Sequence, residues 1–255
     1  MFYKLGVIIG LLIISAACLY FIPPIPQWNS YHQFPDNLTF FSITNFANVT
    51  SNIGFVAVGF FGLFTIFSKK LFNRKLDLIP YAVFFSSIIL VGVGSAYYHL
   101  NPTTETLFWD RLPMSISFMS FFAAIICDRI NKITGTYVLL PTLILAGIYS
   151  VIHWQQTEIS GEGDLRLYVL VQYFPMFAIP IIMLLFPRYK YTPPVPIYWA
   201  LAWYLIAKLF EYFDLDMLNL LSNFSSGHTL KHIAATVTVI CILKMLINSK
   251  KLQKM

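Results

Sequence analysis

The sequence predicts an all-α integral membrane protein, and its composition and its hydrophobic patterning both support this fold class. Of the 255 residues, 58% are hydrophobic and 11% are charged, whereas soluble domains carry about 25% charged residues. The mean hydropathy is +0.70. The apolar residues gather in segments of about 20 residues, which is the length that a helix needs to cross a bilayer. We therefore expect a polytopic helical protein with short loops and no soluble domain.

Eight apolar segments are long enough to form membrane helices. They cover about residues 5–22, 46–67, 79–100, 110–127, 137–154, 165–186, 197–213 and 227–249. The first segment follows Lys4, as in a signal peptide. However, Pro23 and Pro24 follow it, and no small-residue cleavage site is present. We therefore expect that this first helix is retained.

The loops between these segments alternate in charge. Lysine and arginine gather after the second, fourth and sixth segments and at the C-terminus, whereas the loop 155–164 is acidic. Positively charged loops favour the cytoplasmic side, so we expect both termini to be cytoplasmic. The net charge of +6 then lies mainly in cytoplasmic loops. It does not indicate a nucleic-acid partner, and the sequence indicates no protein partner.

Three histidines are candidate metal ligands. His228 and His232 begin the last apolar segment, and His99 ends the third. Residues four apart share one helix face, and the predicted topology puts all three at the outer side of the membrane. Three imidazoles with one open position are typical of a catalytic zinc site, in which a bound water has a pKa of about 7. Alternatively, each histidine caps a helix at the interface. The metal hypothesis requires His99 to lie within about 6 Å of the other two.

Asp110 and Ser95 are candidate catalytic residues at the same side of the membrane. A carboxylate near a zinc-bound water can accept its proton and pass it to a leaving group. Alternatively, Asp110 favours a helix dipole or pairs with Arg111. Ser95 lies one turn before His99, so its hydroxyl could donate to a developing oxyanion. Its alternative role is a helix contact made by small residues.

Further polar residues lie in or beside the apolar segments. Lys208 and Glu211 fall inside the seventh segment, where charged groups are costly and are therefore functional candidates. Alternatively, they pair with each other, with Asp214 one turn further on. Polar residues also open the sixth segment on the outer side, where they could line the pocket or bind lipid headgroups: Arg166, Tyr168 and Gln172.

Five motifs of this chain resemble those of the alkaline ceramidases and their bacterial relatives, over about residues 31–255. They are NFANVTSN at 45–52, GSAYYH at 94–99, WDRLPM at 109–114, AKLFEYFD at 207–214 and SGHTLKH at 226–232. The order Ser-x3-His, Asp, His-x3-His is shared with a wider superfamily that includes adiponectin-type receptors. The first motif and the run to Asp110 are similar to those of ceramidases specifically.

The resemblance implies a seven-helix bundle with an intramembrane zinc ion. His99, His228 and His232 would ligate Zn²⁺, Asp110 would orient or deprotonate the water, and Ser95 would support the oxyanion. The implied enzyme is a hydrolase that cleaves a ceramide-like lipid amide to a sphingoid base, or another amine, and a fatty acid. Its active site would lie near the exoplasmic leaflet.

Two departures from the family pattern qualify this prediction. Residues 1–23 would form one extra N-terminal transmembrane helix, and residues 24–255 the seven-transmembrane domain. The eukaryotic enzymes also have an acidic calcium site before the first shared helix, for which Asp36 and Asn45 are only weak matches. Calcium needs several oxygen ligands, so we expect no calcium site.

Two other functions are also compatible with the sequence. The first is a receptor-like or lipid-binding membrane protein of the same superfamily, with a structural zinc. The second is a transporter with Lys208 and Glu211 as a proton relay, but the chain lacks the paired broken helices expected of transporter repeats.

Overall fold

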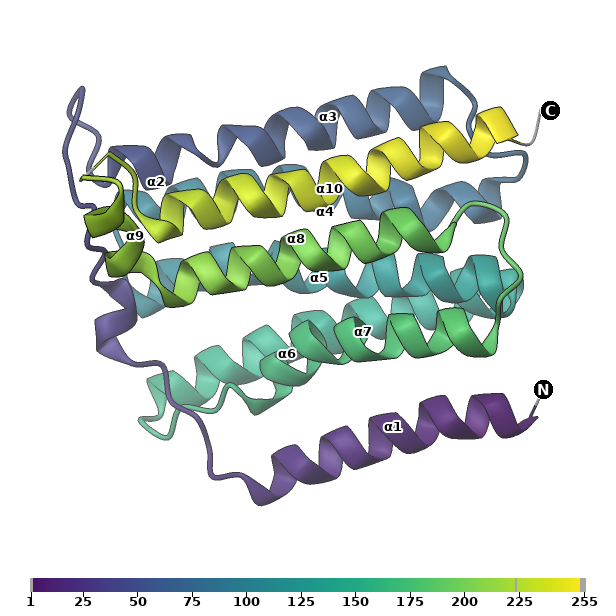
Figure 1. Cartoon of the computed structure of the whole chain (residues 1–255). Coiled ribbons are helices and arrows are strands. Elements are labelled where there is room, and N and C mark those ends of the chain that lie inside the picture. The colour runs from purple at the N-terminus through teal and green to yellow at the C-terminus, as the bar shows by residue number, and fades with distance from the viewer. Residues whose placement is uncertain (1, 223, 253–255) are drawn as a thin grey trace. The chain divides into compact units, whose positions relative to one another are not determined.

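The computed structural model describes residues 2–222 and 224–252, most of which fold into helices (Figure 1). Seven helices of these residues are long and apolar enough to cross a membrane. A helix rises about 1.5 Å per residue, so 20 residues match a hydrocarbon core of about 30 Å. The prediction of a multi-pass, all-α membrane protein is therefore confirmed.

The helices fall into two compact units, and each unit is built from three separate segments of the chain. In order, the elements are α1 (Phe2–Phe21), η1 (Asn29–His32), α2 (Phe46–Thr50), α3 (Ile53–Ser68), α4 (Lys75–Leu100), α5 (Thr104–Arg129), η2 (Thr134–Leu139), α6 (Leu140–Ile159), α7 (Arg166–Leu185), α8 (Pro194–Tyr212), α9 (Asp214–Leu220) and α10 (Gly227–Leu252). Unit 1 comprises Met1–Gln27, Phe72–Phe84 and Ser115–Lys190, and unit 2 comprises Trp28–Leu71, Phe85–Met114 and Tyr191–Met255.

Each of the eight predicted segments forms a long helix, but several helix ends differ from the expectation. α5 begins at Thr104, so Asp110 lies in its second turn rather than at its start. α8 forms as expected, but it is not among the seven apolar helices. It carries Lys208 and Glu211, which lower its hydropathy. The predicted segment 46–67 is divided into the short helix α2 and the long helix α3, and the short helix α9 was not predicted, because it lies between two apolar segments.

Unit 1 joins α1 to α7 through contacts near both ends of α1. Lys4 Nζ donates a hydrogen bond to the Leu185 carbonyl oxygen at 2.6 Å. Near the other end of α1, Arg166 Nη1 donates to the Ile22 carbonyl oxygen at 2.8 Å. α1 buries none of its side chains. Its apolar side chains therefore suit contact with lipid rather than a protein core.

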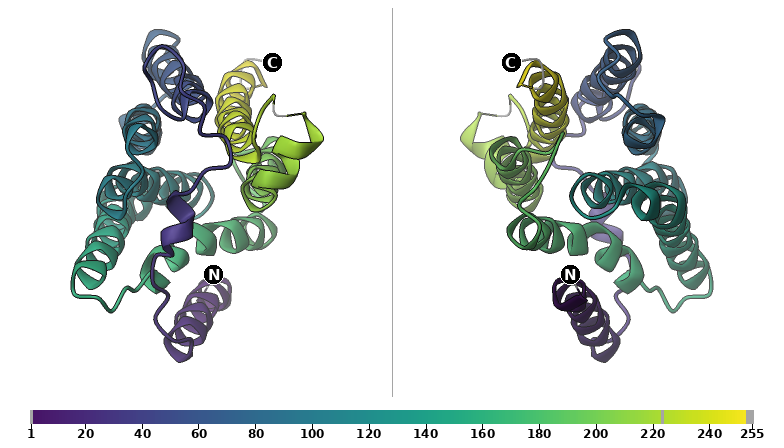
Figure 2. Two further views of the ribbon diagram at one scale, coloured as in Figure 1. Left: turned by 90° about the vertical axis from the view of Figure 1, so that its left-hand side faces the viewer. Right: turned by 90° about the vertical axis from the view of Figure 1, so that its right-hand side faces the viewer.

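Unit 2 is built around α10, which packs against α8 and α3 (Figures 1 and 2). Figure 2 shows these three helices nearly along their axes. Glycines allow the helices to approach closely, as is common in membrane bundles. A Cβ at Gly62 of α3 would lie 2.3 Å from Phe85 Cδ1 of α4. A Cβ at Gly227 of α10 would lie 2.2 Å from the Phe210 carbonyl oxygen of α8. The start of α10 is therefore held tightly against the end of α8.

Candidate metal centre

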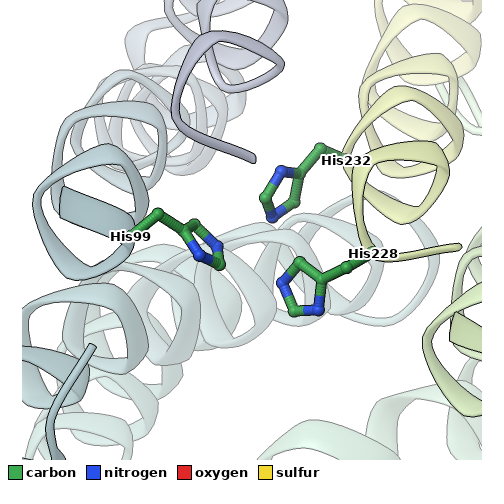
Figure 3. Close-up of side chains that lie close together, drawn as sticks. All are labelled: His99, His228 and His232. Carbon is green, nitrogen blue, oxygen red and sulfur yellow. The ribbon is translucent and has the colours of Figure 1, made fainter. Parts of the chain in front are cut away.

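Three histidine side chains meet inside unit 2. His99 lies in the last turn of α4, whereas His228 and His232 lie one turn apart at the start of α10. Figure 3 shows the three rings pointing toward one another from these two helices. A ligand nitrogen of each ring lies within 4.8 Å of those of the other two. This spacing is inside the limit of about 6 Å that the metal hypothesis requires.

The histidines fit a metal ion because they are buried and several of their ring nitrogens have no hydrogen-bond partner among the described residues. Their exposed fractions are 0% for His99, 4% for His228 and 3% for His232. Both ring nitrogens of His99, and Nε2 of His228, are buried without a hydrogen-bond partner among the described residues. Each unpaired buried polar atom costs about 1–3 kcal/mol. A metal ion removes this cost, and imidazole nitrogen is a preferred zinc ligand.

Ser95 and Asp110 lie together where α4 meets α5. Both are buried, and the Ser95 side chain hydrogen-bonds to the Asp110 carboxylate. Gly94 makes this approach possible, because a Cβ there would lie 2.0 Å from the Trp109 carbonyl oxygen. Ser95 is one turn before His99 on the same helix face. The arrangement therefore links a buried carboxylate to the helix face that carries one of the imidazoles.

Comparison with known protein families identifies this chain. A family model described as Ceramidase matches residues 38–254, which is most of the 255 residues. The chain belongs to the ceramidase family. No curated protein matches the chain. Membership implies an amide hydrolase whose substrate is a lipid of the bilayer, and the matched region contains the three histidines, Ser95 and Asp110.

Aromatic side chains cover the three imidazoles. The ring centroid of Phe34 lies 4.7 Å from that of His99 and 4.6 Å from that of His228. Phe34 is 9% exposed and comes from the loop before α2. The ring centroid of Phe55 of α3 lies 6.2 Å from that of His232. An apolar shell of this kind limits water access to a metal site and tunes its chemistry.

Glu211 is the centre of a charged network in the ceramidase bundle. It accepts hydrogen bonds from Lys208, from Lys231 Nζ at 2.9 Å and from the Tyr31 hydroxyl at 3.2 Å. Burial and the Glu211 carboxylate raise the pKa of Tyr31 well above its usual value, so the phenol stays protonated and donates. The pairing of Lys208 with Glu211, which the sequence offered as the alternative to a functional role, is therefore present. Lys231 and Tyr31 donate further hydrogen bonds to the same Glu211 carboxylate.

The three polar residues predicted to line the pocket or bind headgroups belong to unit 1. Arg166 Nη2 contacts Asp164 Oδ2 at 2.8 Å, and this guanidinium holds the pKa of Asp164 below its usual range. Together with its bond to the Ile22 carbonyl, this contact ties the start of α7 to the residues that follow α1. Tyr168 and Gln172 are buried within α7.

The two residues considered as weak calcium matches are used in backbone contacts. Asn45 Nδ2 donates to the His99 carbonyl oxygen at 2.9 Å. The Asp36 carbonyl oxygen accepts from Asn48 Nδ2 at 3.4 Å. Asn45 therefore contacts the backbone of a candidate metal ligand, and the backbone of Asp36 contacts α2.

Sequence reasoning missed several residues that contact the histidines or the Glu211 network, because their contacts join segments distant in the chain. These residues are Ser51, Asn48, Asp214, Lys231 and Phe34. Asp214 was considered only as a partner of the Lys208–Glu211 pair, but its Oδ1 accepts the backbone N–H of His228 at 2.7 Å. The motif at 45–52 was the available signal for Ser51 and Asn48, but it carried no role for either residue.

Proposed function

We propose that this chain is a zinc-dependent membrane hydrolase that cleaves ceramide-like lipid amides. The products are a sphingoid base, or another amine, and a fatty acid. One water molecule is consumed, the amide C–N bond breaks, and the new oxygen stays on the acyl carbon. The main support is the cluster of three buried imidazoles, two of which carry nitrogens without a hydrogen-bond partner among the described residues, in a chain of the ceramidase family.

The residues around this cluster have distinct proposed roles. His99, His228 and His232 would hold the zinc ion. When bound, zinc polarises a carbonyl and activates a water molecule as a nucleophile. Asp110 accepts the proton of the attacking water and delivers it to the leaving nitrogen. Ser95 orients the Asp110 carboxylate through its hydrogen bond and supports the developing oxyanion.

The membrane setting completes the proposal. We infer that both termini are cytoplasmic and that the histidines lie near the exoplasmic leaflet, because basic loops alternate with loops that are acidic or lack lysine and arginine. We further propose that α1 (Phe2–Phe21) is additional to a seven-transmembrane ceramidase domain of residues 24–255. The family match begins at residue 38, after this helix. The ceramide-like substrate enters from the bilayer.

The test compares Asp110→Asn with the unchanged protein, purified in detergent and supplied with a ceramide. Loss of the carboxylate is expected to lower the turnover about 10²–10⁴-fold, the usual contribution of a general base. The zinc content, measured by elemental analysis, should be unchanged. Asp216→Asn is the matched control, because Asp216 is exposed on α9 and should retain full turnover.

Two results would contradict the proposal. A purified chain that contains no zinc and binds none would remove the metal. A chain that keeps zinc but hydrolyses no lipid amide would favour the receptor-like alternative with a structural metal.

A further inference from the structure

The segment 45–52 connects the two helices that carry the histidines. Asn45 Nδ2 donates to the carbonyl oxygen of His99 at the end of α4, at 2.9 Å. Three residues later, Asn48 Oδ1 accepts from Thr229 Oγ1 of α10 at 2.8 Å. Asn48 is fully buried. The short helix α2 and the residue before it therefore bridge α4 and α10 through two asparagine side chains.

Ser51 directly follows α2 and contacts a proposed metal ligand. Its Oγ lies 2.8 Å from His232 Nδ1. The same Oγ lies 3.0 Å from the carbonyl oxygen of Asn48, to which it donates. This carbonyl is itself held in place, because Asn52 Nδ2 donates to it at 2.8 Å. The contact to His232 is therefore the end of a chain of three hydrogen bonds anchored in α2.

The direction of these hydrogen bonds decides which nitrogen of His232 is available. A serine hydroxyl has one proton, so a Ser51 that donates to Asn48 can only accept from His232. The proton of the neutral imidazole then resides on Nδ1, and Nε2 keeps its lone pair. A metal needs such an unprotonated nitrogen, and a bond to the other ring nitrogen commonly sets this tautomer.

In a purely structural interpretation, the Ser51 hydroxyl only donates a hydrogen bond to the backbone of the preceding helix turn. Thr50 behaves in this way, because its Oγ1 donates to the Phe46 carbonyl at 2.8 Å. Ser51 differs from Thr50, since its oxygen also reaches an imidazole on another helix. These two adjacent hydroxyls therefore provide a matched pair for experiment.

We propose that Ser51 is a positioning residue of the metal centre. It selects the tautomer of His232 and orients the ring, while Asn45 and Asn48 hold α4 and α10 at the separation that the three histidines require. The proposal rests on the proposed function in one respect, namely that His232 ligates a metal ion. Loss of such an outer contact typically weakens metal binding about 10–100-fold.

The experiment measures zinc affinity by competition with a chromophoric chelator, using the full chain purified in detergent. Ser51→Ala is expected to bind zinc about 10–100-fold more weakly than the unchanged protein. Ser51→Thr keeps the hydroxyl and should restore the affinity. Thr50→Ala should bind zinc as the unchanged protein does. The visible spectrum of bound Co²⁺ should change in Ser51→Ala and remain unchanged in Thr50→Ala.

A further variant covers the possibility that Ser51→Ala does not fold. Ser51→Val has nearly the shape of threonine but no hydroxyl, so its zinc affinity should fall below that of Ser51→Thr. Wild-type affinity and an unchanged Co²⁺ spectrum in Ser51→Ala or Ser51→Val would overturn the positioning role alone. Failure of the unchanged chain to bind either metal would overturn the proposed metal centre together with this inference.

Discussion

The three histidines of the candidate centre are held in different ways. His232 has a hydrogen bond to Ser51, whereas both ring nitrogens of His99 lack a partner among the described residues. The His99 ring is instead held by packing, with Phe34 at a centroid distance of 4.7 Å. Either tautomer of His99 is therefore compatible with its surroundings. At His232, by contrast, the contacts with Ser51 and with the Asn48 backbone restrict the choice.

Gly94 controls the approach of Ser95 to Asp110. Gly94→Ala would put a methyl carbon 2.0 Å from the Trp109 carbonyl oxygen, so α4 and α5 must move apart. Overpacking of this kind costs about 1–3 kcal/mol. We expect a lower midpoint of thermal unfolding in detergent and a large loss of the proposed ceramide hydrolysis, because the contact of Ser95 with Asp110 opens.

The control for this substitution is Gly10→Ala in α1. A Cβ at Gly10 meets no atom within 4 Å, and alanine favours a helix over glycine by about 1 kcal/mol. This variant should unfold at the same temperature as the unchanged protein or at a higher one. Full hydrolysis by Gly94→Ala would show that the approach of the two helices does not matter for the site.

Two short polar contacts hold the start of α10. Asp214 Oδ1 accepts the His228 backbone N–H at 2.7 Å, and Ser226 Oγ accepts the Thr229 N–H at 3.2 Å. The first N–H groups of a helix have no partner within the helix, so such acceptors stabilise it. Because His228 is one of these first residues, the cap and the candidate metal ligand belong to the same turn.

The contact of Asp214 with the His228 N–H should contribute to the stability of the folded chain. Asp214→Ala should lower the free energy of unfolding by about 0.5–2 kcal/mol, the usual cost of losing a capping side chain. Asp214→Asn should retain most of the stability, because asparagine caps about as well as aspartate. Chemical or thermal unfolding in detergent measures both changes.

Asp216 of α9 serves as the matched control for the cap. Its side chain is exposed, so Asp216→Ala should leave the free energy of unfolding unchanged. Equal stabilities of Asp214→Ala and Asp216→Ala would show that the contact with His228 contributes nothing.

In unit 2 as a whole, the candidate centre joins α4 to α10, two helices far apart in the sequence. The described residues already connect them through α2, by way of Asn45 and Asn48. A metal ion bound to His99 and to both histidines of α10 would add a second connection. Ligands that bind only the folded state stabilise it, by about 2.7 kcal/mol when their concentration is 100 times the dissociation constant.

Removal of the metal should therefore lower the stability of the folded chain. We expect dialysis against a strong chelator to reduce the midpoint of thermal unfolding in detergent, and added zinc to restore it. The variant His99→Ala should show little response to either treatment, because the centre has lost one of its ligands. An equal response of this variant and the unchanged protein would place the relevant metal elsewhere.

The sequence by itself determined the fold class, the positions of the long helices and the candidate metal ligands of this protein. Helix-forming apolar segments depend on hydrophobicity over about 20 neighbouring residues, which can be read locally. The pairing of His228 with His232 follows from helical spacing alone, and His99 joined them through the predicted topology. The tertiary structure brought their nitrogens within 4.8 Å of one another.

Only the tertiary structure decided how the site is supported. The contacts of Ser51 with His232, of Asn45 with the His99 carbonyl and of Asp214 with the His228 N–H join residues that share no local pattern. Hydrogen bonds depend on the positions of atoms to within a few tenths of an ångström. Hydrophobic periodicity predicts that helices form, whereas their mutual packing sets distances of that precision.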